Sequence, residues 1–129
     1  MTHENFISKA LSYSEPVASG STTQFLHLLS DSINTSTLSD NSLVVRFLAA
    51  PVNPVDLLVL AGKYPVKPRF RIGNSSIAGY DGIAEVVWVG SAASSFFRVG
   101  DRVLPRAHGF GTGARRESAG AGRVLAALA

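Results

Sequence analysis

The sequence predicts a mainly β, barrel-like domain with one or two short helices, and three observations support this prediction. Apolar runs rich in β-branched residues recur along the chain, and turns that contain glycine separate them. Only one short helix carries a clear start and stop, so strands do not alternate with helices as in a doubly wound sheet. With 129 residues, the chain has room for one compact domain but not for a second.

The first part of the chain predicts two modest strands and then a well-buried one. Residues 9–13 begin as a short strand, and residues 24–29 form a second strand after a loop rich in Ser, Gly and Thr. The polar stretch 30–41 is expected to be a surface connection. Residues 42–49 are dominated by Leu, Val and Phe, which predicts a strand with little exposed surface.

A short helix is expected to begin at Asn53. This residue is a good N-cap, Pro54 fits the first helical position, and Asp56 in the first turn faces the positive end of the helix dipole. Gly62 can adopt the left-handed conformation that ends a helix. The prolines that follow predict an extended, largely unpaired loop over residues 63–72.

Turns and short strands continue toward the C-terminus. Residues 79–82 predict a turn that leads into a strand over 83–89, and residues 99–105 predict a tight turn before another strand. Glycine and alanine make up more than half of residues 109–129, which offers little side-chain volume for a core. We expect this stretch to fray, with a helical turn or two at 124–129.

The composition excludes several classes of protein. A net charge of +3 and a pI near 9.7 are too mild for a typical nucleic-acid binder. The absence of cysteine excludes disulfides and cysteine-based zinc sites, and the three histidines lie far apart without ligand spacing, so no metal is expected. No apolar run reaches the roughly 20 residues that a membrane span needs. The N-terminus shows neither a secretory signal nor a clear mitochondrial presequence.

Four motifs occur in a fixed order. They are Asn53-Pro54-x-Asp56, Gly62-x-Tyr64-Pro65, Gly79-x-x-Gly82-x-x-x-Val86-x-x-Val89-Gly90 and Gly100-Asp101-x-Val103. Together they resemble the N-terminal, GroES-like catalytic domain of the medium-chain dehydrogenase/reductases, which is a partly open β-barrel. Pro105 followed by Gly109-Phe110-Gly111-Thr112 is similar to a signature of the mitochondrial 2-enoyl thioester reductases within that superfamily.

The turn at Gly79-Tyr80-Asp81 departs from two branches of the superfamily. The zinc-dependent alcohol dehydrogenases carry Gly-His-Glu there, so the ligand histidine is missing and the resemblance implies no catalytic zinc. The enoyl reductases usually carry Asn-Glu at the same place.

The resemblance implies NADPH-dependent reduction of 2-enoyl thioesters, carried by acyl carrier protein or coenzyme A, in mitochondrial fatty-acid synthesis. Residues 1–112 would be an incomplete catalytic domain and residues 113–129 a Gly/Ala/Arg-rich tail. The Rossmann domain that holds most of the nucleotide would be absent, and we expect the isolated chain to be inactive. Two alternatives stay open: a zinc-free quinone oxidoreductase, and a truncated, non-enzymatic interaction module.

Tyr64 is the candidate catalytic residue, because it matches the tyrosine proposed as proton donor in the enoyl reductases. A phenol keeps its proton at neutral pH and can therefore donate it without prior activation. Four basic residues follow or flank it, Lys63, Lys67, Arg69 and Arg71, and could steer a phosphate-rich or carboxylate-rich acyl carrier.

No residue of this chain is assigned to the nucleotide. Gly109-Phe110-Gly111-Thr112-Gly113-Ala114 fits the pattern G-x-G-x-x-A, but Glu117 comes too soon to be the acidic residue of a dinucleotide fingerprint, and no second strand is expected to follow. The resemblance further implies a mitochondrial location, with a cytoplasmic one as the alternative. It allows a homodimer of the full-length protein and implies no nucleic acid and no membrane span.

Overall fold

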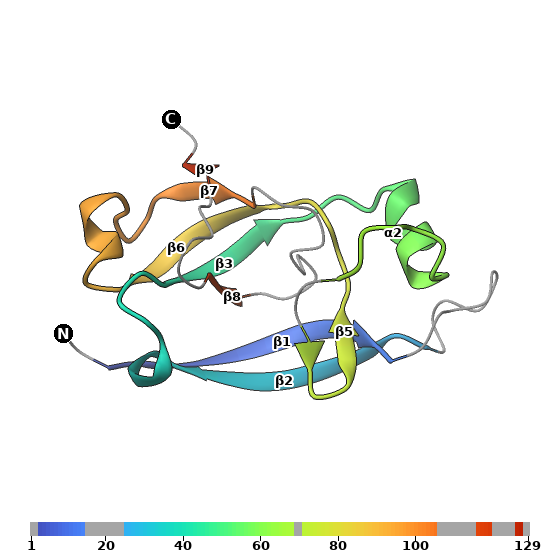
Figure 1. Cartoon of the computed structure of the whole chain (residues 1–129), viewed down its shortest axis with the longest axis horizontal. Helices are drawn as coiled ribbons and strands as arrows, with labels where there is room; N and C mark the ends of the chain where they lie inside the picture. Colours follow the sequence, from blue (N-terminus) through green and yellow to red (C-terminus); the bar gives the residue numbers. More distant parts are fainter. Residues whose placement is uncertain (1–2, 15–24, 69–70, 106–115, 120–125, 128–129) are drawn as a thin grey trace.

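The computed structural model describes residues 3–14, 25–68, 71–105, 116–119 and 126–127 and arranges them as two β-sheets with a short helix at one end (Figure 1). One sheet has the strand order β2-β1-β5-β4 and the other β8-β3-β6-β7-β9. This architecture confirms the mainly β fold that the sequence predicts.

The first sheet is built on a long hairpin. Its strands β1 (Asn5–Tyr13) and β2 (His27–Asn34) pair antiparallel, and β1 also pairs with β5 (Ser75–Ile77) at its C-terminal end. Strand β4 (Arg71–Ile72) completes this sheet beside β5. From Ser8 onward, alternate residues of β1 are buried, as expected for a strand with one face on the core.

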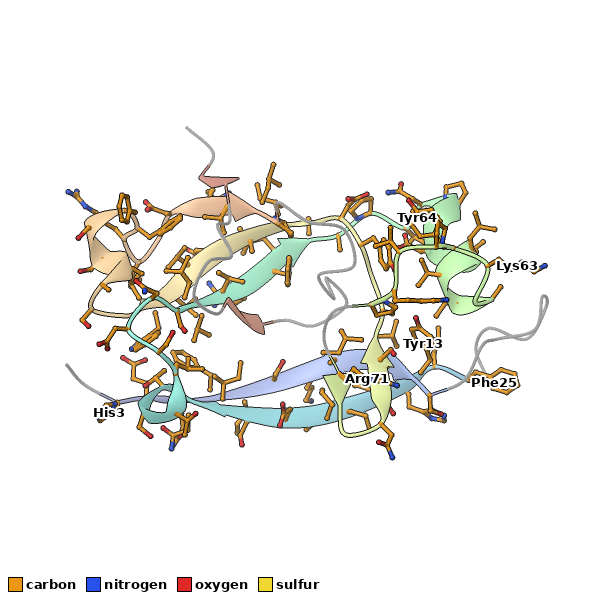
Figure 2. The ribbon with its side chains drawn as sticks, viewed as in Figure 1. His3, Tyr13, Phe25, Lys63, Tyr64 and Arg71 are labelled. Carbon is orange, nitrogen blue, oxygen red and sulfur yellow. The ribbon has the colours of Figure 1, made fainter. Side chains whose placement is uncertain are left out.

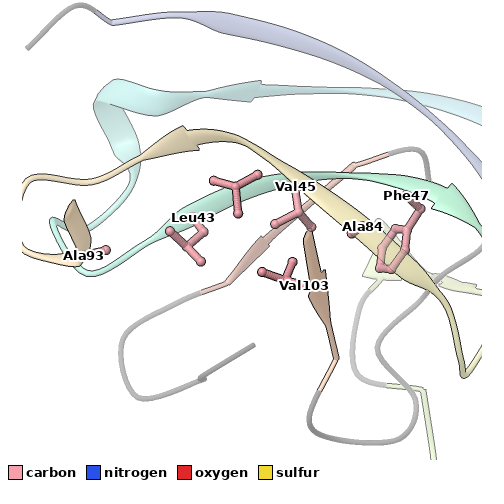
Figure 3. Packing of buried hydrophobic residues seen from close by; sticks show 7 residues of the cluster. Leu43, Val45, Phe47, Ala84, Ala93 and Val103 are labelled. Carbon is pink, nitrogen blue, oxygen red and sulfur yellow. The ribbon is translucent and has the colours of Figure 1, made fainter. Parts of the chain in front are cut away.

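The second sheet carries most of the apolar core. Its strands are β3 (Leu43–Ala49), β6 (Ile83–Val89), β7 (Arg102–Leu104), β8 (Arg116–Ala119) and β9 (Ala126–Ala127). Buried side chains gather on β3, β6 and β7 and on the bend before β7 (Figure 3): Leu43, Val45, Phe47, Ala84, Val86, Ala93 and Val103. This packing fixes β3 and β6, and with them the two ends of the segment between them.

The helix α2 (Pro54–Leu60) follows β3 along the chain and lies at one end of the two sheets (Figure 1). It begins as predicted, because Asn53 is extended at the N-cap and its backbone N–H donates to the Asp56 carboxylate over 2.7 Å. Two single-turn 3-10 helices, Thr35–Thr37 and Ala93–Ser95, lie in the connections after β2 and β6.

The structure differs from the sequence-based expectation in several places. Arg116–Ala119 pairs with β3 as the strand β8, in the stretch that was expected to fray. The polar stretch expected as a connection begins with the second half of β2, because its backbone pairs with β1 in continuous register. The end of the loop expected to be unpaired forms β4, which makes a tight hairpin with β5. Ala126–Ala127 pairs with β7 as the short strand β9, where helical turns were expected.

Candidate functional site

The C-terminal end of α2 fixes the backbone that leads to Tyr64. Gly62 adopts a left-handed φ of 69°. Its N–H donates to the Val59 carbonyl over 3.0 Å, and the N–H of Lys63 donates to the Leu58 carbonyl over 2.9 Å. This is the Schellman arrangement of a helix end, which requires glycine or a similarly permissive residue at the left-handed position. Tyr64 therefore follows a backbone segment with little conformational freedom.

Three tyrosines from distant parts of the sequence meet beside this helix end. Tyr13 comes from the end of β1, Tyr64 from the loop after α2, and Tyr80 from the turn before β6. They pack with the buried helix residues Val59 and Leu60, and we call these five residues the tyrosine cluster. Figure 2 shows Tyr64 beside α2 and Tyr13 at the end of β1.

Tyr80 is the innermost member of the tyrosine cluster, with 2% of its surface exposed. The rings of Tyr64 and Tyr80 meet edge to face, with centroids 5.7 Å apart and planes at 73°. The hydroxyl of Tyr80 donates a hydrogen bond to the backbone carbonyl of Val66, two residues after Tyr64. Tyr64 itself is only partly buried, so its ring lies between the core and the surface.

Burial raises the pKa of Tyr80 to about 12, with smaller contributions from the nearby Tyr13, Tyr64 and Asp56. Burial also raises the pKa of Tyr13, and the positive charge of Arg71 partly opposes that rise. Both side chains therefore stay neutral at physiological pH. Both act in the site through packing, and Tyr80 also through the hydrogen bond from its hydroxyl to the Val66 carbonyl.

The turn that carries Tyr80 is tied to the start of α2. The side-chain amide of Asn53 donates to the carboxylate of Asp81 over 3.2 Å. Asp56 accepts from the backbone of Asn53 through one carboxylate oxygen, while its other oxygen is buried without a hydrogen-bond partner in the described structure. The capping role that the sequence predicts is thus confirmed for Asp56, and Asn53 in addition links the helix to the turn.

A cavity of about 310 Å³ adjoins the same helix. Apart from Asp56, its walls are apolar or glycine: Leu11, Leu26, Ala50, Pro51, Val52, Leu57, Val59, Leu60, Ala78 and Gly79. Since Val59 and Leu60 also belong to the tyrosine cluster, the cavity and the cluster share a wall.

The basic candidates do not all lie on one element. Lys63 and Lys67 lie exposed on the loop after α2, whereas Arg71 belongs to β4 and donates to the Asn74 carbonyl over 3.1 Å. Figure 2 shows Lys63 pointing away from the body of the protein beside α2, and Arg71 near Tyr13. Arg69 lies outside the described residues.

The glycine-rich stretch of residues 109–114 also lies outside the described residues. Within the described part of the chain, no group of three or more His, Asp or Glu side chains could hold a metal ion. None of the helices described here is long and apolar enough to cross a membrane.

The sequence singled out Tyr64 but not the residue beneath it. Residues 79–82 were predicted as a turn and as part of a family motif, but Tyr80 itself was noted only as a departure from related patterns. A tyrosine between glycine and aspartate in a turn gives no periodic sign of burial, so its packing emerges only when α2 and β1 come together around it. The aromatic residue in place of a polar one was the one available signal.

Comparison with known families identifies a match over residues 39–125 to the alcohol dehydrogenase GroES-like domain. The match extends beyond residue 112, where the sequence predicts the domain to end. The chain is 39% identical over 84 residues to the mitochondrial enoyl-[acyl-carrier-protein] reductase of Caenorhabditis elegans. That alignment covers 62% of this chain and 23% of the worm protein. The chain thus spans about a quarter of the length of such relatives.

Solved structures agree with this comparison. The complex of Etr1p with NADP and crotonyl-CoA superposes with a TM-score of 0.83 at 29% identity, covering 95% of this chain and 34% of that one. The mitochondrial 2-enoyl thioester reductase Etr1p/Etr2p heterodimer from Candida tropicalis gives a TM-score of 0.83 at 28% identity, with 95% and 34% covered.

The raised pKa of Tyr80 predicts a specific loss of stability at alkaline pH. The folded protein holds this proton up to about pH 12, whereas the unfolded chain releases it near pH 10.0. The free energy of unfolding should therefore be unaffected by this group below pH 10 and fall as the pH rises from 10 toward 12, by at most about 1.4 kcal/mol per pH unit. Urea unfolding across this range measures the slope.

The Tyr80→Phe variant, which lacks the titrating hydroxyl, is the control for this measurement. Its slope should be shallower by about one proton, while Tyr13 continues to contribute in the same direction. An equal slope in both proteins would show that Tyr80 does not cause the loss.

Proposed function

The chain belongs to the alcohol dehydrogenase GroES-like domain family, and from this membership we propose that it is the substrate-side domain of an NADPH-dependent 2-enoyl thioester reductase. One observation carries the proposal. The loop after α2 holds a partly buried tyrosine, Tyr64, whose ring contacts the buried ring of Tyr80 edge to face. Hydrogen bonds at the end of α2 fix the backbone just before it.

The reaction needs a hydride at Cβ of the conjugated thioester and a proton at Cα. NADPH, when bound, supplies the hydride. The proton comes from the Tyr64 hydroxyl, and solvent returns a proton to the resulting phenolate. Because a phenol is uncharged before the transfer, no ion has to be desolvated when the substrate enters.

We assign the main NADPH contacts to the part of the reductase that lies outside the region covered by this chain. The proposed substrates are acyl groups on acyl carrier protein or coenzyme A, since a similar structure holds crotonyl-CoA. The apolar cavity beside α2 is compatible with a substrate that has a hydrocarbon part. We further propose a mitochondrial location and a dimeric full-length enzyme, as in the relatives.

A zinc-free quinone oxidoreductase is the second candidate. The chain is 30% identical to a putative NADPH:quinone reductase from Bacillus thuringiensis, with 90% of this chain and 32% of that one covered. The TM-score of 0.61 for that structure is well below the 0.83 of the Etr1p complex, so the backbone favours the enoyl reductase.

The proton-donor role can be tested in a chimera in which this chain replaces the matching domain of Etr1p. The chimera should oxidise NADPH in the presence of crotonyl-CoA. Tyr64→Phe should lower kcat by about 100-fold or more, since general acid catalysis is lost, and change the Kd for NADPH by less than about twofold. Stopped-flow absorbance of NADPH and equilibrium titration provide the two measurements.

Tyr13→Phe is the matched control, because it removes a hydroxyl from the same cluster without touching the proposed donor. It should keep kcat within about twofold of the parent chimera. A chimera that binds NADPH but reduces only quinones would favour the second candidate. Full turnover in Tyr64→Phe would refute the donor role.

We propose that Lys63, Lys67, Arg69 and Arg71 steer the acyl carrier toward Tyr64. Lys63 and Lys67 lie exposed on the loop next to Tyr64, and Arg71 lies near Tyr13 of the same cluster. Coenzyme A and acyl carrier protein are both anionic, so a cationic approach surface would raise the rate of productive encounter.

The double variant Lys63→Glu/Lys67→Glu tests the steering role in the same chimera. It should raise KM for crotonyl-CoA several-fold at low ionic strength and leave kcat nearly unchanged, and the effect should shrink as salt shortens the screening length. Lys9→Glu reverses an exposed charge on β1, away from the loop after α2, and is the control for charge reversal itself. A KM that is insensitive to both charge and salt would argue against steering.

A further inference from the structure

Both the ring and the hydroxyl of Tyr80 contact the loop that carries Tyr64. The ring is enclosed by Tyr13, Val59 and Leu60 and has 2% of its surface exposed. A buried hydroxyl needs a hydrogen-bond partner, and this one finds the backbone carbonyl of Val66. Contacts other than the one with Tyr64 therefore hold Tyr80 in place. Its side chain is too buried to reach a substrate itself.

The four residues from Lys63 to Val66 are held at both ends. At the first end, the N–H of Lys63 is bonded to the Leu58 carbonyl over 2.9 Å. At the other end, the Val66 carbonyl accepts from Tyr80. Between these anchors lies Pro65, whose ring restricts its own φ and also the conformation of Tyr64 before it. Few backbone conformations of this segment satisfy both anchors.

The ring contact adds the side chain to this arrangement. An edge-to-face contact at 5.7 Å and 73° favours one orientation of the Tyr64 ring over its alternatives. The turn of Tyr80 is in turn linked to the start of α2 through Asn53 and Asp81. The turn of Tyr80, whose ring contacts Tyr64, is thus linked to the same helix whose C-terminal end holds Lys63.

We propose that Tyr80 is a positioning residue for the proton donor: its ring orients the Tyr64 ring, and its hydroxyl fixes the loop through the Val66 carbonyl. The inference rests on the proposed role of Tyr64. Proton transfer tolerates little misplacement, and an error of about 1 Å can cost on the order of 100-fold in rate. A residue that never touches the substrate can therefore control turnover.

Limited trypsin cleavage of the 129-residue chain tests the loop contact without any activity. Tyr80→Phe keeps the ring but removes the bond to Val66, so cleavage after Lys63 should become about fivefold faster, as expected for the loss of one ordinary hydrogen bond. Cleavage after Arg98, in the exposed bend before β7, is the internal reference and should not change. Tyr13→Phe, which keeps the Val66 bond, should leave both rates unchanged.

Turnover in the Etr1p chimera tests whether this position matters for chemistry. Tyr80→Phe should lower kcat by about tenfold and Tyr80→Leu, which also removes the ring, by more, with KM for NADPH unchanged in both. In the Tyr64→Phe background, Tyr80→Phe should produce no further loss of kcat, because the positioned hydroxyl is already absent. A residue with only a general structural role would reduce kcat in both backgrounds.

The outcomes separate this inference from the proposed function. Unchanged cleavage after Lys63 in Tyr80→Phe, or equal acceleration after Lys63 and Arg98, would overturn the positioning role and leave the donor role of Tyr64 intact. Faster cleavage after Lys63 together with full turnover in Tyr64→Phe would overturn the donor role, and the positioning role would fall with it.

Discussion

Burial of the Tyr80 ring constrains the loop that carries Tyr64. A phenol with 2% of its surface exposed cannot leave its hydroxyl unbonded without a cost of about 1–3 kcal/mol. The hydroxyl donates a hydrogen bond to the backbone carbonyl of Val66, and this bond holds the loop against the core. The location of Tyr64 then follows from the short distance along the chain between Val66 and the helix end.

The two sheets provide the rigid frame that this local constraint needs. Strands β3 and β6 share a packed core, and α2 and the turn of Tyr80 lie in the segment between them. Tyr13, at the end of β1 in the other sheet, packs against the same residues and completes the tyrosine cluster. Residues that carry chemistry often lie on loops held by such a frame, and Tyr64 occupies that position here.

Local signals in the sequence predicted the elements that local chemistry determines. The helix between Asn53 and Gly62 was predicted correctly because its cap, its proline and its terminal glycine act within a few residues of one another. The strands at 42–49 and 83–89 were predicted correctly because their apolar residues form continuous runs. In these segments the side chains themselves favour the observed structure.

Elements that depend on pairing with distant backbone were not predicted. The polar second half of β2 and the tiny hairpin of β4 and β5 have no apolar period, and only their partners make them strands. Similarly, Tyr64 could be found because it stands in a motif, whereas Tyr80 could not, because its burial depends on contacts between α2 and β1. The candidate proton donor, Tyr64, could therefore be predicted from the sequence, whereas the contact of Tyr80 with it could not.

A crystal structure of the Etr1p chimera with NADP and crotonyl-CoA would test the central claim most directly. We expect the Tyr64 hydroxyl to face the substrate, within about 3.5 Å of Cα or the thioester oxygen. We also expect the Tyr80 ring to remain beneath Tyr64, with its hydroxyl bonded to Val66. A Tyr64 hydroxyl that points into the domain interior, with no reacting atom within hydrogen-bonding reach, would contradict the account.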